Sequence, residues 1–219
     1  MSLSCAVLVF AKAPVAGYAK TRLMPALGAD GAARLAGRLL RHAVQQACAA
    51  RVGPVQLCCA PDAGHPAFAA LAQAHGVSLA AQGDGDLGAR MARALRGALG
   101  RHGRALLIGT DAPGLDAAYL RQAAALLAGH DAVFGPATDG GYTLVGLSRP
   151  ADTLFDGIAW STAQVMAQTR ERLRAAGLSH AELAPLPDID GPGDLRHLPR
   201  DWTAEALLRD PSTRDEQEE

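Results

Sequence analysis

Short runs of apolar residues alternate along the chain with longer segments in which apolar residues recur every three or four positions. The apolar runs predict strands at 5–10, 55–60, 77–81, 105–108, 132–135, 142–147 and 182–186. The periodic segments predict helices at 31–51, 66–75, 87–99, 116–128 and 161–176. Strands that alternate with helices predict an α/β sandwich with a mainly parallel sheet, and the close pair at 132–147 predicts some antiparallel pairing.

Four polar residues stand at the start of predicted helices, where a side-chain oxygen can accept a hydrogen bond from the first turn. They are Asp30, Asp86, Asp116 and Ser161. Asp86 has a second interpretation, because it follows a polar glycine turn at 82–86 and could equally contact a ligand. Gly76 is expected to end the helix at 66–75.

The composition is that of a globular protein. The chain has 219 residues, a net charge of −1, 49% hydrophobic residues and 4% aromatic residues. We expect one domain over 1–210 and a polar, disordered tail over 211–219. The balanced charge and scarce aromatics argue against nucleic acid as a partner. No apolar run approaches the ~20 residues of a membrane span.

The apolar segment 5–10 lacks a basic flank, which favours a strand over a signal peptide. The four cysteines lack C-x-x-C spacing, so we expect buried free thiols in a cytoplasmic protein. Adjacent Cys58 and Cys59 should point to opposite faces of their strand.

Lysine occurs only twice, at positions 12 and 20, against 19 arginines. Both lysines fall in the segment after the first strand, which also holds Gly17, Thr21 and Arg22. Cations on a flexible backbone at this position favour a phosphate-binding loop, although the P-loop spacing is absent. The alternative is a solvated loop with ordinary charges.

Other candidate residues follow the carboxyl ends of later strands, where open α/β sheets bind ligands. Asp111 follows the fourth strand and could hold Mg²⁺ or Mn²⁺, or it could be a turn aspartate that bonds its own backbone. The turn Asp139-Gly140-Gly141 could contact an acceptor or could be a simple hairpin turn.

Several motifs resemble, in order, those of a bacterial family of GT-A-like transferases that are labelled as arsenosugar- or radical-SAM-associated glycosyltransferases. The motifs run from about residue 5 to 195: Phe10–Leu23, Gly83–Met91, Gly109–Pro113, Phe134–Tyr142 and Trp160–Thr162. The loop Lys20-Thr21-Arg22-Leu23 is more distantly similar to phospholactate, phosphoenolpyruvate and molybdenum-cofactor guanylyltransferases. The resemblance implies a Rossmann-like GT-A fold, the nucleotide-diphospho-sugar transferase fold, in a three-layer sandwich with a mixed sheet.

The same resemblance implies roles for individual residues. Lys12, Lys20 and Arg22 would bind nucleotide phosphates, Gln82 and Gly88 would lie at the base, and Asp111 would bind the metal. Metal-dependent glycosyltransferases of this fold usually carry D-x-D at the fourth strand. Here Thr110-Asp111-Ala112 supplies one carboxylate, and this motif is more similar to that of the nucleotidyltransferases.

A second carboxylate is expected from the late segment 188–195, which resembles the D-I-D-T-P-E-D-L ending of many nucleotidyltransferases. By that resemblance Asp190 joins Asp111 on the metal, since one carboxylate is a poor Mg²⁺ site. Alternatively the segment only starts a helix, because Pro192 and Asp194 suit a first turn. Gly191 and Gly193 replace the usual Thr and Glu, which removes the capping box.

The sequence therefore predicts a Mg²⁺- or Mn²⁺-dependent transferase with Lys20, Arg22 and Asp111 as catalytic residues. They would neutralise charge on the leaving phosphate. Glycosyl transfer from a nucleotide-diphospho-sugar to a small acceptor is the first hypothesis. Nucleotidyl transfer from an NTP with pyrophosphate release is the alternative, and a non-catalytic nucleotide-binding protein is the third. The base, sugar, acceptor and oligomeric state stay open.

Overall fold

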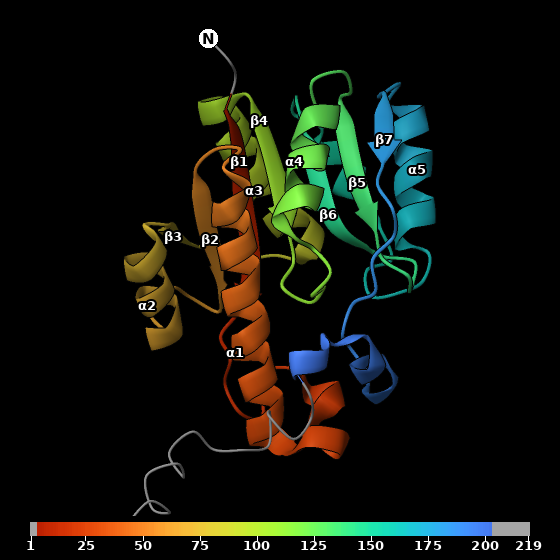
Figure 1. The fold of residues 1–219 in the computed structure, drawn as a ribbon. Coiled ribbons are helices and arrows are strands. Elements are labelled where there is room, and N and C mark those ends of the chain that lie inside the picture. The colour runs from red at the N-terminus through yellow and green to blue at the C-terminus, as the bar shows by residue number, and fades with distance from the viewer. Residues whose placement is uncertain (1–3, 203–219) are drawn as a thin grey trace, which may run out of the picture.

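The computed structural model describes residues 4–202. Its strands are β1 (Cys5–Lys12), β2 (Val55–Ala60), β3 (Ser78–Ala81), β4 (Arg104–Ile108), β5 (Ala132–Pro136), β6 (Tyr142–Leu147) and β7 (His180–Glu182). Its helices are α1 (Met24–Ala50), α2 (Pro66–His75), α3 (Leu87–His102), α4 (Ala117–Leu126) and α5 (Val165–Ala175), as Figure 1 shows. Short 3₁₀ helices are η1 (Thr21–Leu23), η2 (Asp152–Phe155), η3 (Pro192–His197) and η4 (Arg200–Trp202).

The strands form one sheet in the order β3-β2-β1-β4-β6-β5-β7. Strand β1 pairs parallel to β2 and β4, β2 to β3, and β5 to β7. Only β6 runs antiparallel to its neighbours β4 and β5. The predicted mainly parallel sheet and its antiparallel pair are confirmed. The strand order reverses direction between β1 and β4, so a crevice is expected beyond the carboxyl ends of these two strands.

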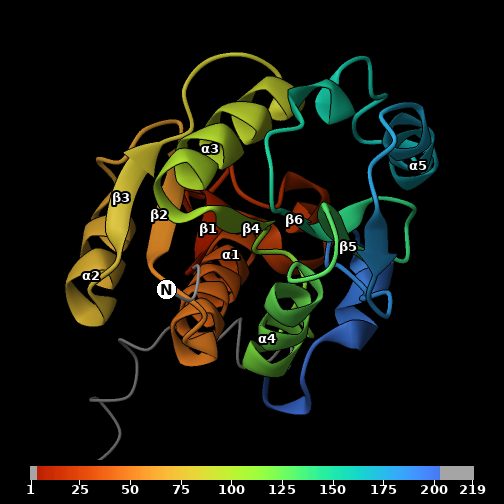
Figure 2. The ribbon, with the colours of Figure 1, turned by 90° about the horizontal axis from the view of Figure 1, so that it is seen from above.

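Helices cover both faces of the sheet, which gives the predicted three layers (Figure 2). Apolar residues of α1, α2 and α4 pack on one face, and those of α3 and α5 pack on the other. Successive strand residues alternate between the two cores. Cys58 and Cys59 belong to opposite cores, as predicted, and burial raises the pKa of Cys58 to about 12.

A third apolar cluster joins the start of α1 to the end of the described chain. Leu23, Leu27 and Leu35 pack there with Ile189 and Trp202, all of them buried. In Figure 1 the late segment lies beside the first turns of α1. This cluster brings residues near position 189 to the loop that follows β1.

Two predicted caps are confirmed. The Asp86 carboxylate accepts a hydrogen bond from the Ala89 N–H at 2.8 Å, and the Asp116 carboxylate accepts one from the Tyr119 N–H at 2.8 Å. The predicted end of α2 at Gly76 is also confirmed, with Gly76 at φ 64°.

Two other predicted caps are not formed. Gly28 (φ 69°, ψ 170°) is non-helical and divides α1 into a short part that begins at Met24 and a long part that begins close to the predicted start at 31, but Asp30 makes no capping hydrogen bond there. Helix α5 begins at Val165 because Ser161 adopts a left-handed conformation (φ 62°) and caps nothing.

The last strand and the first loop also differ from the prediction. β7 spans 180–182, and Leu186 keeps only an isolated bridge to Ala137. β1 extends to Lys12, which pairs with Ala60 and so belongs to the strand end instead of the loop. The predicted tail at 211–219 lies outside the described residues. Within residues 4–202, no helix is both long and apolar enough to cross a membrane.

Candidate functional site

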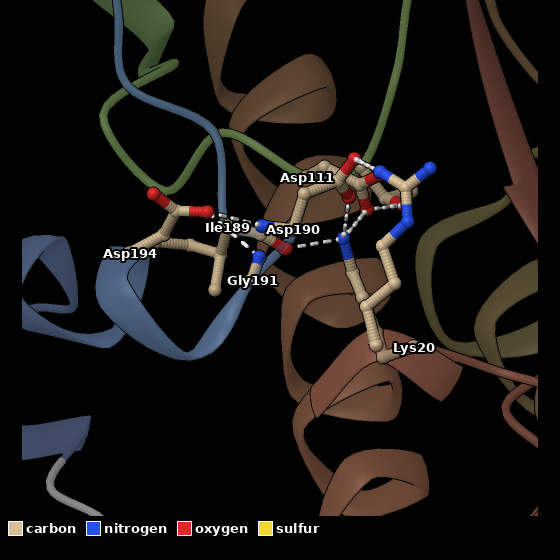
Figure 3. Close-up of polar contacts among 8 residues, drawn as sticks. Lys20, Asp111, Ile189, Asp190, Gly191 and Asp194 are labelled. Carbon is tan, nitrogen blue, oxygen red and sulfur yellow. Dashed lines mark hydrogen bonds and ion pairs between the residues drawn. The ribbon is translucent and has the colours of Figure 1, made fainter. Parts of the chain in front are cut away.

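The ammonium of Lys20 lies at the centre of a polar cluster beyond β1 and β4 (Figure 3). Its Nζ is 2.8 Å from Asp111 Oδ1 and 3.2 Å from Asp190 Oδ1, and it donates a hydrogen bond to the Ile189 carbonyl at 2.6 Å. The side chain is 8% exposed. The backbone of Lys20 is left-handed (φ 50°, ψ 43°) as the chain turns into η1. A buried ammonium with three oxygen partners is well compensated electrostatically.

Asp111 and Asp190 meet although they are far apart in the sequence. The Ile189 N–H donates to the Asp111 carbonyl at 2.9 Å, which ties the late segment to the loop after β4. The side chains of Asp111 and Asp190 are 45% and 46% exposed. Each carboxylate therefore has one side on Lys20 and another open to solvent.

Asp194 holds the backbone next to Asp190. Its carboxylate accepts hydrogen bonds from the N–H groups of Asp190 at 3.1 Å and Gly191 at 2.7 Å, and these bonds lower the pKa of Asp194. The half of the capping box that reaches back to the N-cap is thus present despite the glycines. Because Asp194 does this, the carboxylate of Asp190 is left to face Lys20 and Arg22.

Asp188 also belongs to the cluster, and sequence reasoning missed it. Burial raises the pKa of Asp188 to about 6, with further contributions from the negative charges of Asp139, Asp190 and Asp111. The signal was its spacing of two from Asp190, because alternate residues of an extended segment share a side. The resemblance to the nucleotidyltransferase ending implies a role only for the second aspartate of that pair.

Asp139 and Gly140 each have a structural reason in the turn at 139–141. Asp139 Oδ1 accepts a hydrogen bond from the Gly141 N–H at 2.8 Å. Gly140 has φ 96°, and a Cβ there would lie 2.2 Å from the Ala163 carbonyl oxygen. The effect of Asp139 on Asp188 nevertheless places this turn beside the carboxylates, at the predicted edge of the sheet.

The remaining predicted phosphate-binding residues are exposed. Arg22 is 72% exposed, and its Nη1 lies 3.7 Å from Asp190 Oδ2. Gly17 has φ 81°, a conformation that favours glycine, and Thr21 begins η1. Lys12 is exposed at the tip of β1. Arg22 and Lys20 are thus brought together on Asp190, whereas Lys12 makes no hydrogen bond or ion pair with that cluster.

Gln82 is buried, and its side chain joins two strand ends. Its Nε2 donates to the carbonyls of Ala11 at 3.2 Å and Cys58 at 3.0 Å, while its Oε1 accepts from Arg90 Nη1 at 3.0 Å. The amide therefore fixes the carboxyl ends of β1 and β2. Any contact of Gln82 with a base would have to share or replace these bonds.

Gly88 is required by close packing. A Cβ at this position would lie 2.8 Å from the Phe155 carbonyl oxygen and 3.0 Å from Trp160 Cζ2. Gly88 and Asp86 also line a cavity of about 430 Å³ between α3 and η2, whose lining includes neither lysine nor Asp111. The structure therefore places Gly88 against η2 and Trp160.

Comparison with known sequences decides the family. The bacterial family described as "Uncharacterized protein conserved in bacteria (DUF2064)" matches residues 40–162. The chain belongs to the DUF2064 family. No curated protein matches it.

Solved structures show the fold of this DUF2064 protein. A protein of Desulfovibrio desulfuricans G20, provisionally named a nucleotide-diphospho-sugar transferase, is 33% identical over 94% of both chains, with a TM-score of 0.82. A nucleotidyl transferase of Methanothermobacter thermautotroptrophicus is 15% identical over 91% of this chain and 97% of that one (TM-score 0.58). A protein of Mycobacterium tuberculosis H37Rv in complex with manganese is 18% identical over 89% and 97% (TM-score 0.51). The predicted nucleotide-diphospho-sugar transferase fold is confirmed.

The DUF2064 match covers only part of the site. It includes Gln82, Gly88, Asp111 and the turn at 139–141, but Lys20 and Asp190 lie outside it. Within residues 4–202, no group of three or more His, Cys, Asp or Glu side chains is arranged to hold a metal ion. In the structure Asp111 and Asp190 instead share the Lys20 ammonium.

Proposed function

We propose that this DUF2064 protein is a metal-dependent transferase that uses a nucleotide, with its reaction centre at Asp111, Asp190 and Lys20. The observation that carries the proposal is the meeting of these three side chains beyond β1 and β4. Support comes from the Desulfovibrio relative, whose name is that of a nucleotide-diphospho-sugar transferase, and from the manganese bound to the M. tuberculosis protein.

The residues present fit a divalent metal. Mg²⁺ and Mn²⁺ prefer carboxylate and carbonyl oxygens, and Asp111 and Asp190 each turn an oxygen toward the same point. The Lys20 ammonium at that point is a cation standing where a metal cation would be held. Asp111 and Asp190 would hold the metal, which when bound would neutralise negative charge on phosphate oxygens.

The chain's own residues would bind and orient the two substrates. Lys12, Arg22 and the backbone at Gly17 and Thr21 would bind the phosphates of the nucleotide, since exposed cations attract them. Lys20 would stabilise the charge that builds up on the leaving phosphate.

The base and the acceptor would lie on either side of that centre. Gln82 would position the strand ends next to the base, and Gly88 would keep α3 close to Trp160 on that side. Asp139, Gly140 and Gly141 would face a small-molecule acceptor. Membership of the family labelled as arsenosugar- or radical-SAM-associated glycosyltransferases belongs to the same proposal.

Glycosyl transfer is the first form of the reaction, because the relative that is 33% identical carries the name of a sugar transferase. An acceptor oxygen attacks the anomeric carbon of a nucleotide-diphospho-sugar, and a nucleoside diphosphate leaves. Nucleotidyl transfer is favoured by one specific observation. The carboxylate that shares the Lys20 ammonium with Asp111 comes from Asp190 in the late segment, not from a neighbouring residue of a D-x-D motif.

A product assay separates these reactions. The protein is incubated with Mn²⁺, candidate small acceptors and either NTPs or nucleotide sugars. A nucleoside diphosphate indicates glycosyl transfer, and pyrophosphate indicates nucleotidyl transfer. Nucleotide binding without either product would mean a non-catalytic nucleotide-binding protein and would refute the proposal.

A further inference from the structure

Lys20 occupies the position that the two candidate metal ligands share. Its ammonium contacts one oxygen each from Asp111, Asp190 and Ile189, at distances of 2.6 to 3.2 Å (Figure 3). The lysine is the buried member of the cluster, and the carboxylates are the half-exposed ones. The ammonium therefore fills the inner side of the carboxylate pair.

An ammonium and a divalent ion compete at close range for the Oδ1 oxygens of Asp111 and Asp190. Mg²⁺ requires oxygen ligands at about 2.0–2.1 Å in near-octahedral geometry. Two cations on the same carboxylate oxygens would repel each other strongly in a partly buried site. Lysine, unlike arginine, is a point charge on a flexible stem and can leave by rotating its side chain.

We propose that Lys20 is a built-in competitor of the divalent metal, which enters only when the ammonium leaves Asp111 and Asp190. The inference rests on the proposed function, in which nucleotide phosphates offer the ammonium another anionic partner. Metal and nucleotide would then bind with positive cooperativity, because each makes room for the other. The protein without nucleotide would hold Mn²⁺ weakly although both carboxylates are already in place.

The test measures Mn²⁺ affinity without nucleotide by the EPR signal of free Mn²⁺. Lys20→Met should bind Mn²⁺ tighter than the wild type by about fivefold or more, a typical size for such coupling. Lys12→Met is the matched control, because it removes the same charge from the exposed tip of β1 and should change the affinity far less. In the double variant Lys20→Met/Asp111→Asn the gain should disappear. Unchanged or weaker Mn²⁺ binding by folded Lys20→Met would overturn the proposal.

A second measurement uses the wild-type chain and does not depend on a variant that folds. The sequence has two lysines, so acetylation by acetic anhydride can be followed at each by mass spectrometry. Lys20 should react more slowly than Lys12 without metal and faster once EPR shows that Mn²⁺ is bound, while Lys12 stays constant. If Lys20 is still acetylated slowly with Mn²⁺ bound, the proposed displacement of its ammonium by the metal is wrong.

The two proposals can fail separately. If the protein forms product with Mn²⁺ but Lys20→Met does not bind Mn²⁺ more tightly, the competition is refuted and the transferase proposal stands. If Lys20→Met binds Mn²⁺ more tightly but the wild type forms no product, the transferase proposal is refuted. The competition for Asp111 and Asp190 then stands.

Discussion

At the scale of single residues, the site depends on the charge of Asp111 more than on its shape. Its backbone carbonyl holds Ile189, and its carboxylate holds Lys20. An amide at this position keeps the backbone bond and loses the charge. The two functions of Asp111 can therefore be separated by one substitution.

Asp111→Asn should abolish Mn²⁺-dependent product formation and lower the melting temperature by only a few degrees, because an amide is a poor ligand for a hard cation. Asp116→Asn is the matched control. It lies in the same loop, its side chain caps α4, and asparagine caps a helix about as well as aspartate. Product formation and calorimetry measure both variants. Near-native turnover of Asp111→Asn would show that the metal is bound elsewhere.

Asp188 makes stability depend on pH. Its pKa is about 6 in the folded protein against an ordinary 3.8, so the folded state keeps a proton that the unfolded chain has released. Stability contributed by the protonated group is therefore lost as pH rises through the window from about 4 to 6.

Asp188→Asn should remove this loss. We expect the free energy of unfolding to rise by about 1 kcal/mol at pH 7.5, after allowance for solvent around a half-buried group, and to change little at pH 3.5. Urea unfolding at both pH values measures the difference. An equal effect at the two pH values would mean that burial and the neighbouring negative charges do not raise the pKa of Asp188.

At the scale of elements, η3 controls where Asp190 points. Asp194 accepts two backbone hydrogen bonds at the start of this 3₁₀ helix, although it contacts neither Lys20 nor Asp111. Its effect on the site passes through the backbone alone.

Asp194→Ala should therefore lower stability by about 1 kcal/mol, as the loss of a helix cap does, and weaken Mn²⁺ binding in the presence of nucleotide. Asp194→Asn, which can still accept these bonds, should restore much of both. Calorimetry and EPR measure the two effects. A loss of stability with unchanged Mn²⁺ affinity in Asp194→Ala would show that η3 does not orient Asp190.

The apolar pattern predicted the central strands because they are buried on both faces, as in the continuous burial of Ala105–Ile108. The same pattern did not predict helix starts that depend on the backbone conformation of single residues. A short helical segment from Met24 precedes the non-helical Gly28, and Ser161 is left-handed, so α5 starts four residues later. The strand predicted at 182–186 lies earlier, at 180–182, and beyond it Leu183 and Leu186 keep single backbone hydrogen bonds to Phe134 and Pro136 of β5.

At the scale of the whole molecule, the site joins the two ends of the described chain. Lys20 and Asp190 are 170 positions apart, and the apolar cluster of α1 with Ile189 and Trp202 brings them together. Such a contact comes from tertiary packing, so spacing along the sequence could not predict it. The residue types at the strand ends did indicate Asp111 and Lys20, and resemblance indicated Asp190. Neither indicated that Lys20 would occupy the position between the two carboxylates.

The most direct test of the central claim is anomalous X-ray diffraction from crystals of the protein soaked with Mn²⁺ and a nucleotide. The account predicts a manganese peak between the carboxylates of Asp111 and Asp190, with the Lys20 ammonium moved onto the nucleotide phosphates. A manganese peak away from Asp111 and Asp190, or bound nucleotide with Lys20 still between the two carboxylates, would contradict it.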